Sequence, residues 1–140
     1  MIKSWSNPDV EDENLSKNRL ALAYISLSAQ MLRKEVADVR EKTKYIQSYI
    51  HKHFPNQIES LSYELNIAIH DSIPAVKTAL WIKTHLNHKD RLQVLYFLAG
   101  LAFVDGRFNT KELTFLRDLQ SQLELSPKEY DQVIAMYTQR

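Results

Sequence analysis

The sequence has no cysteine, only two glycines and only four prolines among its 140 residues. Without cysteine the chain has no disulfide framework, no thiolate nucleophile and no zinc site built on cysteine. The 18 basic and 17 acidic residues leave a formal net charge of +1, so no field of one sign attracts nucleic acid or an anionic membrane. The alternation of apolar and polar residues that is typical of strands is also missing. We therefore expect an all-α protein that binds neither nucleic acid nor a membrane.

Signals for export or membrane insertion are not found either. Residues 1–14 (MIKSWSNPDVEDEN) contain no apolar core of the signal-peptide kind. The least polar run, residues 92–104, is too short to span a bilayer. Together with the missing cysteines, this favours a cytoplasmic protein. We expect residues 1–14 to form a mobile, partly acidic tail, with Trp5 as the residue able to dock, and residues 15–140 to form one compact helical domain.

The run 92–104 (LQVLYFLAGLAFV) predicts a central helix, because its apolar residues fall on every side of a helix rather than on one stripe. Both glycines of the chain lie in or just after this run. Gly100 is inside the helix, where glycine costs roughly 0.5 to 1 kcal/mol relative to alanine, so we expect a close helix crossing there. Gly106 follows the helix and is expected to adopt the left-handed conformation that ends helices.

Capping signals set the starts of three further helices. Asn109 and Glu112 have the spacing of a capping box, and so do Ser126 and Glu129, with a proline at the first helical position between them. A third box, from Asp38 to Glu41, predicts a helix that runs to residue 53. Apolar periodicity predicts helices over residues 15–32, 58–71 and 74–86 as well, so we expect about seven. The inward-facing residues expected in the helices ending at 53 and 86 are Val39, Ile46, Tyr49, Ile50, Val76, Ala79, Leu80 and Leu86.

An internal repeat links the two halves of the chain. Residues 22–53 and 94–123 share the plan of an apolar helix, a short polar turn and an amphipathic helix. Two registers are open, one that aligns the capping boxes and one that aligns Tyr45 with Phe115. In either register the first copy has no Asp-Gly pair. The repeat predicts two pseudo-repeated helical hairpins.

The turn after the central helix is the candidate site. Residues 105–112 match the second half of an EF-hand loop, with Asp105, Gly106 and Glu112 at the acidic, glycine and bidentate positions. The first half of the loop is missing, because Leu101 and Phe103 occupy the first two ligand positions. A tight calcium site is therefore not expected.

Two interpretations of this turn are open. In the first, which we favour, Gly106 ends one helix, Phe108 fills the core, and Asn109 with Glu112 caps the next helix. Glu112→Gln should then change the stability by only a fraction of about 1 kcal/mol. In the alternative, Asp105 and Glu112 form a weak divalent-cation site with water. No other cofactor is expected.

Catalytic patterns are not found in the sequence. His85 and His88 are three residues apart, yet a metal site needs a further ligand. His51 and His53 are two apart and fall on different helix faces, so surface or capping roles are expected for the histidines. The sequence has no phosphate-binding glycine loop, no Ser-His-Asp order and no nucleotide fingerprint. We therefore predict that the chain is not an enzyme and has no catalytic residue.

Residues 98–125 (LAGLAFVDGRFNTKELTFLRDLQSQLEL) resemble the TerB family of tellurite-resistance proteins and the related N-terminal domain of DjlA-type DnaJ co-chaperones. The shared features are an Asp-Gly pair, an apolar residue two positions later, an acidic residue at the head of the next helix and a Leu-Glu-Leu-Ser close. The matching residues are Asp105, Gly106, Phe108, Glu112, 123–126, Tyr130 and 135–137. The first copy departs from the family, which usually keeps an Asp-Gly pair and a glutamate there too.

The resemblance implies a TerB-like all-α fold and a bacterial, non-enzymatic interaction module. Such a module would act in stress or metal (tellurite) resistance, or as the regulatory domain of a DnaJ-type co-chaperone. Its expected partner is an unidentified protein, with chaperone machinery as one candidate. A weak divalent-metal-binding protein that uses Asp105 and Glu112 is the alternative from another class. The sequence does not set the oligomeric state.

Overall fold

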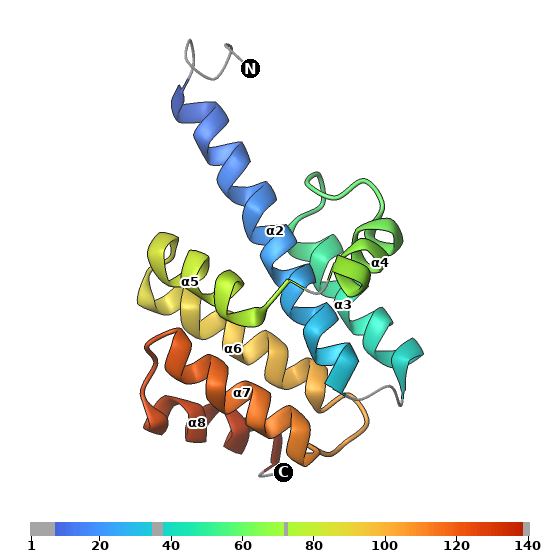
Figure 1. Cartoon of the computed structure of the whole chain (residues 1–140), viewed down its shortest axis with the longest axis vertical. Coiled ribbons are helices and arrows are strands. Elements are labelled where there is room, and N and C mark those ends of the chain that lie inside the picture. The colour runs from blue at the N-terminus through green and yellow to red at the C-terminus, as the bar shows by residue number, and fades with distance from the viewer. Residues whose placement is uncertain (1–7, 35–37, 72, 139–140) are drawn as a thin grey trace.

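A computed structural model describes residues 8–34, 38–71 and 73–138, and every regular element in these ranges is an α-helix. The seven helices are α2 (Pro8–Lys34), α3 (Val39–His53), α4 (Leu61–Asp71), α5 (Ala75–His85), α6 (His88–Ala102), α7 (Thr110–Gln122) and α8 (Pro127–Thr138) (Figure 1). The all-α prediction and the number of helices are thereby confirmed. Within the described ranges, no helix combines the length and the apolar character needed to cross a bilayer.

The first described helix, α2, begins inside the segment that the sequence assigned to a tail. It starts at Pro8, so the predicted helix start at residue 15 is corrected to residue 8, and the mobility of the tail stays a prediction. The signal was present in the sequence, because a proline in the first turn followed by acidic residues is typical of a helix start. Figure 1 shows this end of α2 projecting beyond the other helices. Trp5 lies outside the described residues.

The central helix α6 is buried on all sides over its second half, as the sequence predicted. Its buried residues are Val94, Leu95 and 97–102. They contact α2, α3, α7 and α8. The helix starts at His88, earlier than its apolar run, because the Asn87 side chain accepts a hydrogen bond from the backbone N–H of Asp90 at 2.9 Å. This N-cap was not identified from the sequence.

The helices contact one another in a reciprocal pattern that confirms the internal repeat. Helix α2 packs on α3 and α4, as α6 packs on α7 and α8. Across the two units, α2 contacts α7 as α6 contacts α3. Such paired contacts are those expected of two similar bodies related by an approximate two-fold axis. The third helices of the two units differ, because α8 also packs on α7, whereas α4 packs on α2 without a comparable contact with α3.

Burial decides the register between the copies. When Tyr45 is aligned with Phe115, buried Ile46 and Ile50 coincide with buried Leu116 and Gln120, and the buried residues of α2 coincide with those of α6. The other register depended on a capping box at Asp38, which is wrong. Asp38 has a φ of 59° and its side chain makes no cap hydrogen bond. Val39, predicted to face inward, is exposed at the start of α3.

Helix α5 connects the two three-helix units and has no counterpart in the repeat. It lies against α2 on one side and α7 on the other. Its buried residues are Thr78, Ala79 and Ile82. The prediction that Val76 and Leu80 face inward is wrong, because they are 55% and 57% exposed. The apolar residues of α5 occupy more of its surface than two neighbouring helices cover, so one apolar side faces solvent.

Gly100 allows a close approach, although by tyrosine hydroxyls rather than by a helix backbone. A Cβ atom at Gly100 would overlap the Tyr45 hydroxyl and would lie 2.9 Å from the Tyr137 hydroxyl oxygen. The Tyr45 hydroxyl donates to the Phe97 carbonyl at 3.1 Å, and the Tyr137 hydroxyl donates to the Tyr96 carbonyl at 3.1 Å. Burial raises the pKa of Tyr45 above its ordinary value, so its hydroxyl stays protonated as a donor. Gly100 thus lets two neighbouring helices bond to the backbone of α6.

We predict that Gly100→Ala destabilises the protein, although alanine is the better helix former. The overlap with the Tyr45 hydroxyl should cost about 1 to 3 kcal/mol, more than the roughly 0.5 to 1 kcal/mol gained in helix propensity. The loss should shrink when Tyr45 is replaced by phenylalanine, which removes the overlapping oxygen. Urea unfolding of both single variants and the double variant measures this coupling. A Gly100→Ala variant that is more stable than the wild type would contradict the prediction.

Candidate functional site

The turn between α6 and α7 has the structural features that the favoured interpretation predicted. Gly106 has a φ of +89°, and its N–H donates to the Phe103 carbonyl at 2.9 Å, which ends α6. The half-buried ring of Phe108 packs on Phe103, with a centroid distance of 4.8 Å, and on Tyr137. The N–H of Glu112 donates to Asn109 Oδ1 at 2.7 Å, and Glu112 Oε1 accepts from the N–H of Asn109 at 3.1 Å. The predicted capping box is therefore confirmed.

The second carboxylate oxygen of Glu112 binds an ammonium group from the other repeat. Lys42 Nζ of α3 lies 3.1 Å from Glu112 Oε2, and the two side chains are 0% and 2% exposed. Leaving either charge buried alone would be costly, so each holds the other in place. Both oxygens of Glu112 are thus engaged inside the protein, one by the helix cap and one by Lys42.

Lys42 is the residue of this site that the sequence interpretation missed. It is 70 residues before Glu112, so in the register set by burial the two occupy equivalent positions of the two copies. Equivalent residues that contact each other must lie beside the axis that relates the copies. Lys42 continues the buried stripe of Ile46 and Ile50, spaced four residues apart along α3. The alignment of the two copies that pairs Tyr45 with Phe115 is the sequence signal that could have revealed the ion pair, because it also pairs Lys42 with Glu112.

Asp105, the other predicted site residue, stays on the exposed turn. Its Oδ1 accepts from the N–H of Arg107 at 3.3 Å, and its Oδ2 lies 3.8 Å from Arg107 Nε. The Glu112 side chain is 2% exposed and the Asp105 side chain 17% exposed, while the residue Asp105 as a whole lies on the exposed turn. Within the described part of the chain, no group of three or more acidic or histidine side chains is placed to hold a metal ion. The divalent-cation site at Asp105 and Glu112 stays a prediction, to be tested by metal titration.

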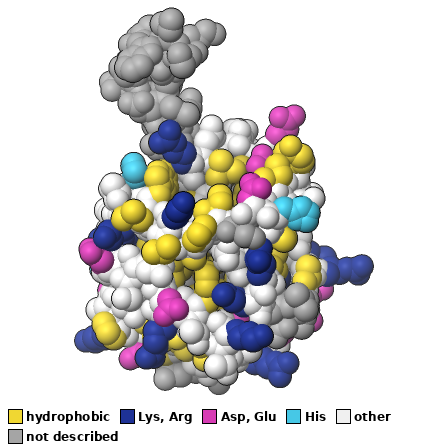
Figure 2. Space-filling view, viewed as in Figure 1, with side chains coloured by type: hydrophobic (Ala, Val, Ile, Leu, Met, Phe, Trp, Pro, Cys, Tyr) yellow, Lys and Arg dark blue, Asp and Glu magenta, His cyan; other side chains and the backbone are white. Residues whose placement is uncertain are grey.

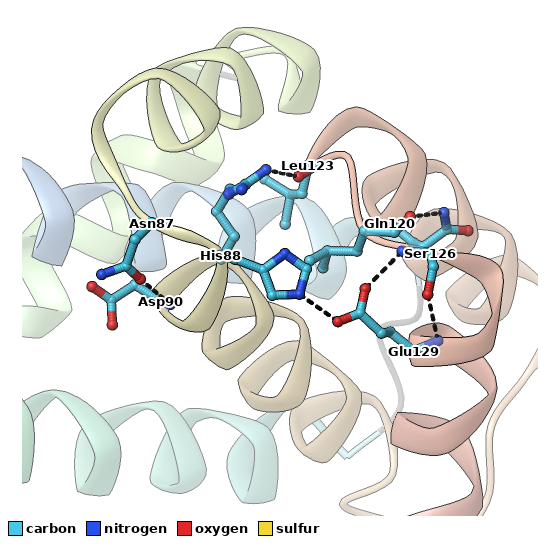
Figure 3. Close-up of polar contacts among 9 residues, drawn as sticks. Asn87, His88, Asp90, Gln120, Leu123, Ser126 and Glu129 are labelled. Carbon is cyan, nitrogen blue, oxygen red and sulfur yellow. Dashed lines mark hydrogen bonds and ion pairs between the residues drawn. The ribbon is translucent and has the colours of Figure 1, made fainter.

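A second polar cluster fixes the start of α6 to the start of α8 (Figure 3). The N–H of Ser126 donates to Glu129 Oε1 at 2.8 Å, and the N–H of Glu129 donates to Ser126 Oγ at 3.0 Å, which confirms the second capping box. Figure 3 shows the His88 ring pointing toward Glu129, with Nε2 at 2.5 Å from Oε2. The Ser126 N–H and then His88 lower the pKa of Glu129 below its ordinary value. Arg91 of α6 adds a 2.7 Å hydrogen bond to the Leu123 carbonyl.

Like the His88 side chain, the side chains of His85 and His53 make contacts within the fold. His85 Nδ1 lies 2.9 Å from the Trp81 carbonyl oxygen, and the His85 ring stacks on the Trp81 ring. The ring of His53 packs on Tyr49 at a centroid distance of 4.2 Å. His85 ends α5 and His88 begins α6, so these two histidines, three residues apart in sequence, belong to different helices.

An exposed apolar region surrounds α5, and we call it the α5 face. It comprises the exposed residues Leu22, Ile73, Val76 and Leu80 with the half-buried Trp81. Figure 2 shows hydrophobic side chains gathered over α5 and the adjacent part of α2, with basic side chains among them. Two shallow hollows, of about 330 Å³ and about 340 Å³, lie on either side of α5. Its exposed apolar side chains make the α5 face a candidate binding surface.

Comparison with known protein families gives a match over most of the chain. The family described as tellurite resistance protein TerB matches residues 21–135, which is most of the chain. The chain belongs to the TerB family. The match runs from the buried part of α2 to α8, so both copies of the internal repeat and α5 lie inside the TerB region. Searches of curated proteins and of solved structures found no match.

TerB membership confirms the resemblance that the Asp-Gly turn suggested, and the all-α fold with it. This TerB chain has a lysine, Lys42, at the position equivalent to Glu112. A positive side chain here faces the negative one, so the two copies are complementary in charge at their axis.

We predict that Glu112→Gln lowers the free energy of unfolding by about 3 to 5 kcal/mol, because it leaves the Lys42 ammonium buried without a counter-ion. This corrects the small effect expected from capping alone. Adding Lys42→Met should restore most of the loss, because it removes the unpaired charge and keeps the apolar stem. Urea unfolding of the single and double variants measures the coupling.

Glu129→Gln is the matched control, because Glu129 has the same position in a capping box without a buried lysine. It should cost about 1 kcal/mol or less. Equal losses at Glu112 and Glu129 would contradict the role of Lys42.

Melting curves with millimolar calcium or magnesium test the cation site in the same samples. A metal-dependent rise in Tm that Glu112→Gln abolishes would establish that site instead.

We predict that Glu129 contributes an acid-dependent part of the stability. Its pKa is lower in the folded protein than its ordinary value of 4.5, so its contribution is present above that value and is lost as the pH falls through the lower folded pKa. Between about pH 5.5 and about pH 3, Glu129→Gln should therefore show a shallower fall in stability than the wild type. Glu124→Gln, at an exposed side chain 3.5 Å from Lys83, controls for the loss of one charge. Parallel curves for wild type and Glu129→Gln would contradict the prediction.

Proposed function

We propose that this TerB-family chain is a non-enzymatic helical module that binds another protein through the α5 face. The observation that carries the proposal is the exposed apolar side of α5, where Val76 and Leu80 are more than half exposed. Helix α5 packs on the core with one side and exposes apolar side chains on the other. An exposed apolar side of this kind favours binding to another protein. The family match supports a role related to tellurite resistance.

Two cellular settings fit such a module. In the first, the chain acts in tellurite or general stress resistance through a protein partner. In the second, it regulates a DnaJ-type co-chaperone, as the likeness of residues 98–125 to DjlA-type domains suggests. Both settings need an accessible apolar surface. The α5 face supplies one, whereas the polar turn at Asp105 and the buried Glu112 offer no comparable contact area.

We predict that Val76→Asp combined with Leu80→Asp abolishes function while the fold is kept, because both side chains are exposed and neither supports the core. The assay is the survival on tellurite of a strain that lacks the gene and carries the wild type or a variant. The double variant should rescue no better than an empty vector. Circular dichroism confirms that it is folded.

Met136→Asp is the matched control, since Met136 is 58% exposed on α8, away from α5. This variant should rescue like the wild type. Full rescue by the Val76→Asp and Leu80→Asp variant would contradict a binding role of the α5 face. A strain without the gene that survives tellurite as well as its parent would contradict the resistance setting and leave the co-chaperone setting.

A further inference from the structure

We propose that the partner of the α5 face is an acidic amphipathic helix of another protein, with apolar side chains on one side and Asp or Glu residues along its edges. This inference rests on the proposed function, and it names the chemistry of the partner. It follows from three features of the α5 face: the spacing of its apolar residues, the hollows beside them and the charge of their borders.

The apolar residues of the α5 face are spaced to receive a helix. Val76 and Leu80 are four residues apart, so they form one ridge along α5, and Ile73 lies two residues before the helix on the side of the first hollow. Ridges with this spacing pack into the grooves of a second helix. Helices bound in this way contribute apolar side chains at positions i, i+3, i+4 and i+7. The partner side chains therefore lie in the two hollows that flank the ridge.

Both hollows have apolar walls. The hollow between α2 and α5 has a volume of about 330 Å³, with Leu22, Ala23, Ile73 and Trp81 among its walls. The hollow between α5 and α7 has a volume of about 340 Å³, and Val76 and Leu80 form its apolar side. Each is open to solvent, so a helix can enter from above without displacing any element of the fold.

The borders of both hollows are basic. Arg19 lines the first hollow and Lys83 the second, and Lys77 lines both, so it lies between them on α5. Among the described residues that line them, Glu124 is the one acid, and Lys83 Nζ lies 3.5 Å from it. No ion pair joins Arg19 or Lys77 to an acid of the described chain. Two basic side chains beside an apolar ridge therefore select a helix with acidic edges and disfavour a basic one.

The test uses the whole chain and three synthetic peptides of about 18 residues, long enough for several helical turns. The first has leucines at helical spacing and glutamates at the edges. The second has lysines in place of the glutamates, and the third has the composition of the first in scrambled order. Fluorescence anisotropy measures each Kd at low and at high salt. The first peptide should bind at least about tenfold more tightly than the other two, and salt should weaken its binding.

Charge reversal on the protein locates the site. Arg19→Glu combined with Lys77→Glu should weaken binding of the acidic peptide by about tenfold or more and should improve binding of the basic one. Arg40→Glu combined with Lys44→Glu makes the same change in net charge at exposed positions of α3 and should leave both Kd values within about twofold. Equal losses in the two double variants, or equal binding of the acidic and scrambled peptides, would overturn the inference.

Two further outcomes separate this inference from the proposed function. If no peptide binds while Val76→Asp with Leu80→Asp still abolishes survival on tellurite, the acidic helix is wrong and the binding role of the α5 face stands.

A second copy of the chain is the other occupant to consider, since residues 9–13 (DVEDE) are acidic. Sedimentation equilibrium tests it: self-association that Arg19→Glu with Lys77→Glu abolishes would assign the α5 face to a homodimer and overturn the inference.

Discussion

The buried ion pair between Lys42 and Glu112 is the constraint on which the arrangement of the two repeats depends. Two charges without solvent access must face each other, because neither can be left alone at acceptable cost. Glu112 also caps α7 through its other oxygen. The cap therefore fixes the position of the carboxylate that Lys42 binds. The pair therefore fixes where α3 lies relative to α7. Two apolar side chains could fill the same space, but they would fix the position of α3 relative to α7 less strictly than two opposite charges do.

The same symmetry explains why a binding surface is found at α5. The two three-helix units cover each other through reciprocal contacts, α2 with α7 and α6 with α3. Helix α5 is the connection between the units, and nothing in the other unit is equivalent to it. Its neighbours α2 and α7 cover Ala79 and Ile82 but leave Val76 and Leu80 exposed. The element that breaks the repeat is thus the one whose apolar surface is available to a partner.

Features that depend on neighbours in sequence could be predicted, and features that depend on distant packing could not. The left-handed Gly106 and the capping boxes at Asn109 and Ser126 follow from a few adjacent residues, and all three were correct. Asp38 shows the limit of that logic, because its backbone is left-handed and its side chain cannot cap. Periodicity placed Val76 and Leu80 inside, since it identifies an apolar face without showing whether a neighbour covers it. The partner of Glu112 was hidden because a lysine on a helix is normally solvated.

The protonation and burial of Lys42 can be observed directly, and this is the sharpest test of the pair that joins the repeats. Nuclear magnetic resonance of the 15N-labelled side chains at neutral pH detects ammonium groups whose protons exchange slowly with water. The structure predicts a Lys42 ammonium signal that is protected from exchange and close to the Glu112 side chain, unlike the signal of exposed Lys44. A Lys42 side chain that exchanges as fast as Lys44 would contradict the buried pair and the axis built on it.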